Sequence, residues 1–161
     1  MTEPSEWCLM EYVSVLAGDT PTDRPAGVHP WPAAMGRWIH DRVSAPARPG
    51  LRDLAPDLVG LDGPDAEVRT AVVTCLAELG AQLAPSSTLY ARLRSGRDHP
   101  RRLVDLGALV VDVCRAVRVL EPAAQDEVLG DLLADVVAAV RATAPGPAAT
   151  PTITELVGAD A

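Results

Sequence analysis

Residues 103–120 read LVDLGALVVDVCRAVRVL, and this stretch decides the fold class. Its main apolar positions are separated by alternating steps of three and four residues. They are Leu103, Leu106, Val110, Val113, Val117 and Leu120. This spacing places them along one side of an α-helix, as in helices that pack side by side in a bundle. The stretch therefore predicts a long helix that starts near Pro100 and contacts other helices.

Similar periodicity on both sides of this stretch predicts further helices. Proline and glycine, of which the chain has 15 and 12, divide it into helix-sized segments. The expected helices span residues 5–17, 30–43, 51–61, 65–84, 86–94, 100–120 and 123–143. For the first helix, Ser5 is the expected N-cap and Gly18 the expected C-terminal stop. Asp62 is the expected cap of the 65–84 helix.

No segment alternates apolar and polar residues with the period of two that a half-buried strand shows. The sequence therefore predicts an all-α, bundle-like single domain of five to seven helices with a loop-rich N-terminal third. The domain is expected to occupy residues 1–144. Residues 145–161 make a tail rich in Pro, Ala and Thr, which is a linker by composition and could dock by one short turn.

Composition argues against several classes of protein. The 161 residues carry 22 acidic side chains against 14 arginines and no lysine, so the net charge is -8 and a nucleic-acid partner is not expected. No run approaches the roughly 20 apolar residues of a membrane span, and the acidic N-terminus is unlike a secretory signal. Three cysteines without paired spacing are not a disulfide framework. We expect a protein of the reducing cytoplasm.

A polar cluster near the N-terminus, formed by Glu11, Cys8, His29 and Asp23, is the candidate catalytic site. Cys8 and Glu11 are three residues apart and lie close on one side of the first helix. That helix is otherwise unusually apolar, so a central position would desolvate the Glu11 carboxylate, which would then need a partner. The following loop could return Asp23 and His29 toward it. Such a set would suit acid–base chemistry, or a Cys8 nucleophile with His29 as its base.

Three interpretations of this cluster stay open. In the first, Glu11 pairs with Arg24, Arg37 or a loop amide and holds the loop in place, since buried charges are usually paired. In the second, the thiol, carboxylate and imidazole converge on a substrate or a metal. The set lacks the paired Cys or His spacing of zinc sites, so no metal ligand is assigned and the cofactor stays unknown. In the third, Glu11 and Ser14 form only a narrow solvent-exposed stripe.

The same N-terminal region carries a run of short motifs. They are CLMEYVSVLAG over residues 8–18, Asp19, TDRP over residues 22–25 and HP over residues 29–30. In these motifs the chain resembles a set of uncharacterised small helical proteins from actinobacteria and their phages. An arginine-only, Ala-rich composition is also typical of GC-rich genomes. The resemblance implies a helical fold and a shared N-terminal feature, and it implies no reaction. Those proteins often carry a second cysteine where this chain has Gly27, which argues against thiol redox or metal chemistry here.

Aromatic side chains are concentrated in the first 38 residues. Together with Arg24, the expected ligand-binding residues are Trp7, Tyr12, Trp31 and Trp38. Between the first two helices these rings could stack a flat ligand, and packing in a small N-terminal core is the alternative. His40, near the end of the second helix, is expected only to interact with the helix dipole.

Charged residues elsewhere give one further candidate. Five arginines and one aspartate fall between Arg92 and Arg102. This segment suits an anionic ligand or an acidic partner surface, or it is a solvated loop that pairs with acidic groups, for instance in a dimer. Four aspartates on the long helices are expected to face solvent; they are Asp105, Asp112, Asp131 and Asp135.

Two functions are therefore expected. In the first, the protein binds or transforms a small molecule in a pocket between the first helix, the 19–29 loop and the second helix, with Glu11 at the centre of its polar groups. In the second, it is a non-catalytic protein–protein interaction module that uses a helical face or the Arg92–Arg102 segment, and self-associates through its seams. A cavity with Glu11 pointing into it would favour the first function. A Glu11 held by arginine or backbone would favour the second.

Overall fold

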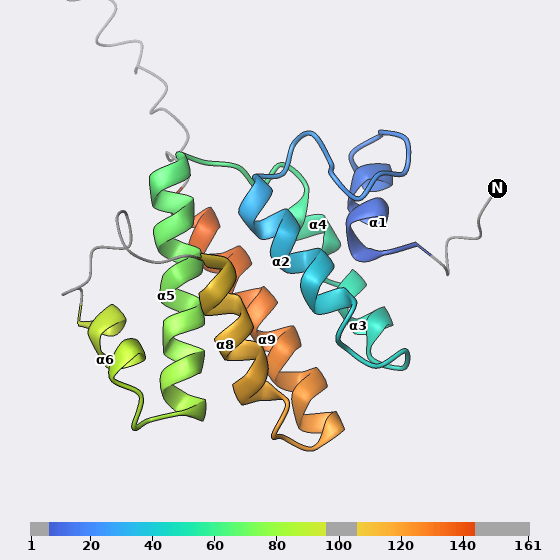
Figure 1. The fold of residues 1–161 in the computed structure, drawn as a ribbon. Helices are drawn as coiled ribbons and strands as arrows, with labels where there is room; N and C mark the ends of the chain where they lie inside the picture. Colours follow the sequence, from blue (N-terminus) through green and yellow to red (C-terminus); the bar gives the residue numbers. More distant parts are fainter. Residues whose placement is uncertain (1–6, 96–105, 144–161) are drawn as a thin grey trace, which may run out of the picture.

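The computed structural model describes residues 7–95 and 106–143 (Figure 1). All regular structure in these two ranges is α-helical, as the sequence predicts. The helices are α1 (Leu9–Leu16), α2 (Pro30–His40), α3 (Arg48–Arg52), α4 (Ala55–Leu58), α5 (Asp65–Leu83), α6 (Thr88–Arg94), α8 (Leu106–Val117) and α9 (Pro122–Arg141). They build a single bundle-like domain.

Helix α5 lies at the centre of this bundle. It packs against α6, α8 and α9, and a smaller contact joins it to α2 (Figure 1). Its buried positions are Val68, Ala71, Val72, Val73, Cys75, Leu76, Ala77 and Gly80. A side chain at Gly80 would collide with the ring of Tyr90, which is buried on α6. Glycine at this position therefore lets α6 lie directly against α5.

The apolar seams predicted for the last two helices are confirmed in part within the described residues, because Val110, Leu120 and Ala139 are only half-buried and α8 ends at Val117. The buried positions are Leu106, Val113 and Val117 on α8 and Leu129, Leu132 and Val136 on α9. Pro122 lies in the first turn of α9, where a helix needs no amide hydrogen. The expected start of α8 near Pro100 lies outside the described residues, as do residues 97–102 of the basic segment and the 145–161 tail.

The first helix is shorter than predicted. It begins at Leu9 with Cys8 as its N-cap, so Ser5 is not the cap. Its end is as predicted, because Gly18 adopts a left-handed backbone with φ of +89°. The amides of Gly18 and of the next residue bond back to carbonyls of the last turn at 3.0 and 2.9 Å, which is the Schellman arrangement.

The segment between α2 and α5 contains two short helices rather than the single one expected over residues 51–61. Pro49 in α3 and Pro56 in α4 each lie in a first turn, the only part of a helix that accepts proline without loss of a hydrogen bond. Asp62 does not cap α5. Its carboxylate accepts the adjacent Gly63 amide at 2.8 Å, and Pro64 is the N-cap residue.

Two polar links join this N-terminal third to α9. Ser44 donates its amide and its hydroxyl to the Asp126 carboxylate at 2.8 and 2.6 Å. Arg141 forms an ion pair with Asp57 at 3.0 Å and donates to the backbone carbonyl of Asp57 at 3.0 Å. Helix α2 also packs against α9. It ends at His40 rather than at the expected residue 43, and the chain then turns toward the Ser44 link.

Candidate functional site

Cys8 and Glu11, two of the predicted catalytic residues, lie together at the start of α1 and cap it. The Cys8 amide donates to the Glu11 carboxylate at 2.8 Å, and the Glu11 amide donates to Cys8 Sγ at 3.4 Å. This reciprocal pair is a capping box, which satisfies two amides that a helix start leaves without partners. The carboxylate is therefore held by backbone, although its partner is the Cys8 amide rather than Arg24, Arg37 or the loop.

The Cys8 thiol is poorly suited to act as a nucleophile. Burial raises the pKa of this thiol above its ordinary value, and the negative charge of Glu11 adds to the increase. A thiol with a raised pKa stays protonated at neutral pH, whereas the thiolate is the reactive form. The environment of Cys8 thus favours its structural role as a helix cap.

Ser14 is fully buried, so the prediction that it forms a solvent-exposed stripe with Glu11 is wrong. Its hydroxyl lies within hydrogen-bond distance of the Glu11 carbonyl at 2.8 Å and of the Thr20 carbonyl at 3.1 Å. It also accepts the Thr22 amide at 3.0 Å. These contacts attach the start of the 19–29 loop to α1.

Asp23 and His29 have partners of their own. His29 caps α2, because its Nδ1 accepts an amide of the first turn at 3.3 Å, while its Nε2 lies 3.6 Å from the Asp65 carboxylate. The backbone carbonyl of Asp23 accepts from Arg37 Nη1 at 2.6 Å, and its carboxylate lies 3.9 Å from Arg37 Nε. The loop thus brings these two predicted residues to Arg37 and Asp65, and Glu11 is bound instead by its neighbour in α1.

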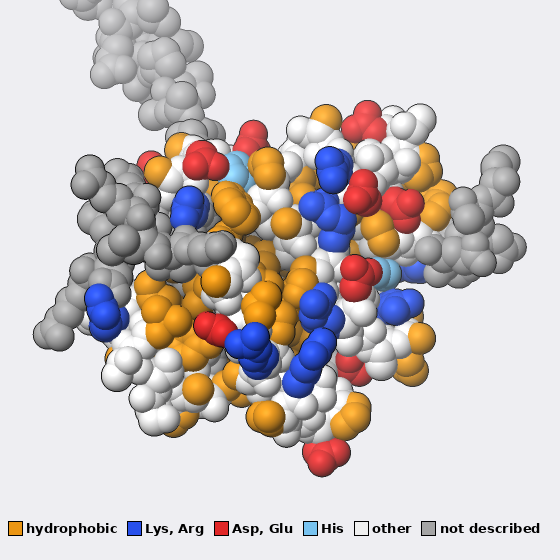
Figure 2. Space-filling view, viewed as in Figure 1, with side chains coloured by type: hydrophobic (Ala, Val, Ile, Leu, Met, Phe, Trp, Pro, Cys, Tyr) orange, Lys and Arg blue, Asp and Glu red, His pale blue; other side chains and the backbone are white. Residues whose placement is uncertain are grey.

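A cleft of about 490 Å³ lies between the 24–30 segment of the loop and α2. Its lining includes charged and apolar side chains, among them Arg24, Val28, His29, Ala33, Arg37 and Asp62. Figure 2 shows basic side chains gathered between the loop and α2, with acidic side chains beside them. This is close to the predicted pocket, and it contains the predicted residues Arg24 and His29. Within the described residues, however, α1 contributes nothing to its lining.

The aromatic residues predicted to bind a ligand, Trp7, Tyr12, Trp31 and Trp38, are half-buried. Tyr12 and Trp38 pack against the hydrophobic core, and each forms a cation–π contact with an arginine. The Arg52 guanidinium lies 5.5 Å from the Tyr12 ring centre, and that of Arg42 lies 4.5 Å from the Trp38 ring centre. Of the part of the chain that the structure describes, none of the four rings lines the loop–α2 cleft. Their contacts fit the alternative of core packing.

The sequence predicts for His40 only an interaction with the helix dipole, but the structure places it in a buried, charged environment. It is 9% exposed, and its Nδ1 finds no hydrogen-bond partner among the residues that the structure describes. Burial lowers the pKa of this imidazole, the Arg48 and Arg52 guanidiniums of α3 lower it further, and the Asp41 and Glu11 carboxylates oppose them. His40 thus lies where charges from α1, α2 and α3 meet. Its spacing in the sequence gives no indication of this, because α3 reaches it only through tertiary packing.

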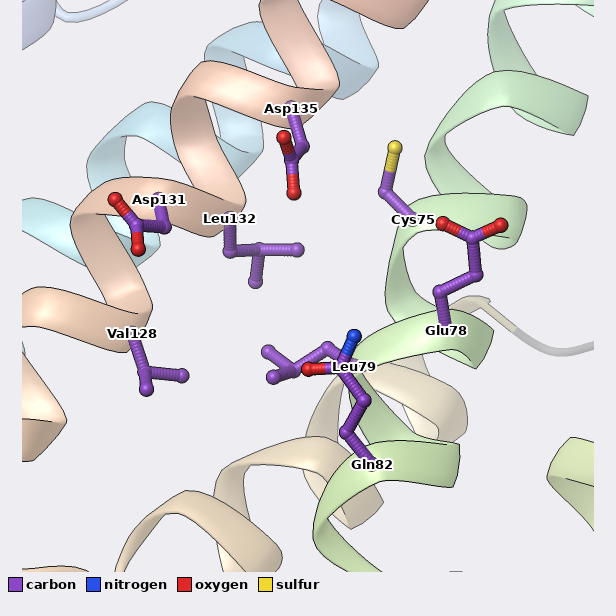
Figure 3. A pocket seen from close by; sticks show the side chains of 8 residues that line it. All are labelled: Cys75, Glu78, Leu79, Gln82, Val128, Asp131, Leu132 and Asp135. Atoms are coloured by element: carbon purple, nitrogen blue, oxygen red, sulfur yellow. The ribbon is translucent and has the colours of Figure 1, made fainter.

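Two grooves run beside α9 and share Asp131. The first, which we call the α5–α9 groove, has a volume of about 160 Å³. Its side chains include Cys75, Glu78, Leu79, Asp131, Leu132 and Asp135, and Figure 3 shows Leu79 and Leu132 pointing into the space between the two helices. The second, the α3–α9 groove, has a volume of about 390 Å³. It is bordered by Leu51, Asp53, Leu54, Glu127, Gly130 and Asp131.

Exposed carboxylates border both grooves. They are Asp53, Glu78, Glu127, Asp131 and Asp135. Among the residues that the structure describes, none of the five takes part in an ion pair, and no arginine lines either groove. Of the four aspartates predicted to face solvent, Asp131 and Asp135 do so, and Asp105 lies outside the described residues. Asp112, by contrast, is half-buried and pairs with Arg115 at 3.3 Å. Burial and the Asp135 and Glu78 charges raise the Cys75 pKa to about 11.

No described helix has the length and hydropathy that a membrane span requires. The described His, Cys, Asp and Glu residues include no group of three or more that could hold a metal ion. Comparison of the chain with protein-family models, with curated proteins and with solved structures gave no match.

Proposed function

We propose that this chain is a docking module that holds a cationic, amphipathic helix of another protein in the two grooves beside α9. The observation that carries the proposal is the row of carboxylates along these grooves, none of which forms an ion pair within residues 7–95 and 106–143. The contact of Glu11 with the Cys8 amide also supports an interaction role, because a catalytic role centred on Glu11 would need that carboxylate free to face a cavity.

The charge on α9 favours a partner of opposite sign. Glu127, Asp131 and Asp135 are spaced along one helix, and no cation of the described residues pairs with them, so they repel one another. Arginine or lysine side chains on a partner would relieve this repulsion. The net charge of -8 would also speed the approach of a cationic segment, since long-range attraction mainly raises the association rate.

Leucines on the floor of each groove favour a helix over a disordered basic tail. Leu51 and Leu54 lie in one groove, and Leu79 and Leu132 in the other, on either side of Asp131. A helix about 10 Å wide could place an apolar stripe on such a floor and its flanking cations against the carboxylates. Polar and apolar groups would then both contribute to recognition.

Gly130 is explained by the same proposal. It lies inside α9, where glycine is less favourable than alanine by about 1 kcal/mol. A Cβ at Gly130 would meet no atom within 4 Å, so packing within the described chain does not require glycine there. It borders the α3–α9 groove, as does Gly50 of α3, whose Cβ would also enter open space. We infer that the absence of a side chain keeps this groove open for a partner.

The test uses the full chain and a fluorescent peptide helix with leucines at positions i, i+3, i+4 and i+7 and arginines elsewhere. Fluorescence anisotropy at physiological salt measures its affinity. We expect the double variant Asp131→Arg/Asp135→Arg to weaken binding by about tenfold or more, because attractions become repulsions. Gly130→Gln should weaken binding by filling the groove and, at the same time, raise the melting temperature, since glutamine is the better helix former.

Two controls separate docking from general attraction between opposite charges. Glu67→Arg/Glu121→Arg makes the same change of charge at exposed positions outside both grooves, and it should affect binding much less. A peptide with serine in place of leucine keeps the charge and should bind weakly. Equal binding of the two peptides, or an unchanged affinity in Gly130→Gln, would contradict the proposal. A dimer of the chain alone that Asp131→Arg dissociates would make a second copy the occupant instead.

A further inference from the structure

The lining of the loop–α2 cleft has no residue in common with that of the α9 grooves within the described chain, and it differs from them in containing arginine. Two guanidiniums, those of Arg24 and Arg37, the buried His29 and the Asp62 carboxylate line it. Outside this lining, the Asp23 carboxylate lies 3.9 Å from Arg37 Nε and the Asp65 carboxylate lies 3.6 Å from His29 Nε2, so Arg24 is the lining arginine without an ion pair among the described residues. Each of the two α9 grooves, by comparison, is bordered by several carboxylates and by no arginine of the described segments. A different ligand chemistry therefore suits this cleft.

Arg37 is held in place before any ligand arrives. Its Nη1 donates to the backbone carbonyl of Asp23 at 2.6 Å, and its Nε lies 3.9 Å from the Asp23 carboxylate. The loop that supplies these partners is itself attached to α1 through Ser14. A guanidinium fixed in this way loses little conformational freedom when it binds an anion, which favours affinity.

The rest of the cleft is largely apolar. Val28 and Ala33 are buried and belong to the hydrophobic core, and Pro25 and Pro30 add rigid apolar surface. The volume of about 490 Å³ lies within the range of roughly 300–1,000 Å³ that is usual for small-molecule sites. A bare inorganic ion would leave most of this surface without contact.

We propose that the loop–α2 cleft binds a small organic anion, with its carboxylate or phosphate on Arg24 and Arg37 and its apolar body against Val28 and Ala33. Arginine suits both anions because its planar guanidinium can donate two parallel hydrogen bonds. The site is a binding site in addition to the docking surface on α9, and it does not depend on that surface.

The experiment is an NMR titration of the full chain with four probes: benzoate, phenyl phosphate, benzamide and inorganic phosphate. We expect benzoate or phenyl phosphate to shift backbone signals of residues 24–37. Benzamide has the same ring without the charge, and inorganic phosphate has the charge without the ring. Each should therefore bind at least about tenfold more weakly than the organic anions. Signals of α9 report separately on the docking surface.

Arg24→Gln is the main variant, because its side chain is exposed and its loss should leave the fold intact. It should weaken binding of the organic anion by about tenfold, the loss expected for a charge-assisted hydrogen bond. Arg37→Gln should do the same, and Arg42→Gln, which removes an arginine that lies over Trp38 outside the cleft, should not. Equal binding of benzoate and benzamide, an unchanged affinity in both cleft variants, or no shift with either organic anion would overturn the proposal.

Discussion

Glu11 and Cys8 hold each other's backbone amides at 2.8 and 3.4 Å, so a carboxylate and a thiol that could have served chemistry instead fix the first turn of α1. The pair matters beyond that turn, because α1 packs against α2, α3 and α4. The start of α1 therefore sets the position of a helix on which the whole N-terminal third is assembled.

Removing the Glu11 side chain should destabilise the fold. We expect Glu11→Ala to lower the free energy of unfolding by about 1 kcal/mol, the usual effect of losing a helix cap. Glu11→Gln keeps an acceptor oxygen for the Cys8 amide and should lie close to the parent protein. Urea denaturation followed by circular dichroism measures both. Equal losses in the two variants would show that the charge of Glu11, rather than its hydrogen bond, is what matters.

Ser14→Ala should loosen the loop that follows α1. The substitution leaves the Thr22 amide without its acceptor, and such a loss costs about 1–3 kcal/mol when the group is buried. Hydrogen exchange of the Thr22 amide should become faster. Ser87→Ala is the matched control, because Ser87 precedes α6 without making a cap hydrogen bond and should change stability by about 0.5 kcal/mol or less.

The protein should lose stability in mild acid through His40. Its pKa is lowered in the folded state, so the unfolded chain binds a proton that the folded chain disfavours. Stability from this group is therefore complete above the ordinary pKa of 6.5 and falls as the pH drops below that value. His40→Gln should flatten the dependence of the urea midpoint on pH between neutrality and pH 5. An unchanged slope in this variant would place the acid sensitivity elsewhere.

Gly80→Ala tests the contact between α5 and α6. Alanine normally stabilises a helix interior by about 1 kcal/mol relative to glycine, but here its methyl group would overlap the Tyr90 ring. We expect the clash to dominate and the free energy of unfolding to fall by about 1–3 kcal/mol. In a double-mutant cycle, the cost of Gly80→Ala should shrink when Tyr90 is already alanine. Independent, additive costs would refute the contact.

The bundle follows from its apolar spacing because burial of α8 and α9 needs only a stripe on each helix. Helix ends were harder to predict. Ser5 is a good N-cap by residue type, yet Cys8 has the position three residues before Glu11 that a capping box requires, and the helix begins there. In α3 and α4 the prolines mark first turns, and two such marks in one segment indicate two helices.

The contacts of the candidate site were harder to predict than the helix ends, because they depend on which partner each polar side chain binds in the folded chain. Arg37 lies in the sequence within reach of both Glu11 and Asp23, and only the path of the loop decides that it binds Asp23. His40 becomes buried among arginines through the packing of α3, which its own helix does not encode. The grooves beside α9 likewise arise between helices, so the exposed aspartates were predictable while the surface they form was not.

The links of Ser44 to Asp126 and of Arg141 to Asp57 join the N-terminal third of the described chain to α9. During synthesis, α2 leaves the ribosome long before α9 does, so the contact between these two helices is then still missing. Local helices can form early, but contacts between distant residues close late. We therefore expect the face of α2 that packs against α9 to stay uncovered until α9 has been synthesised.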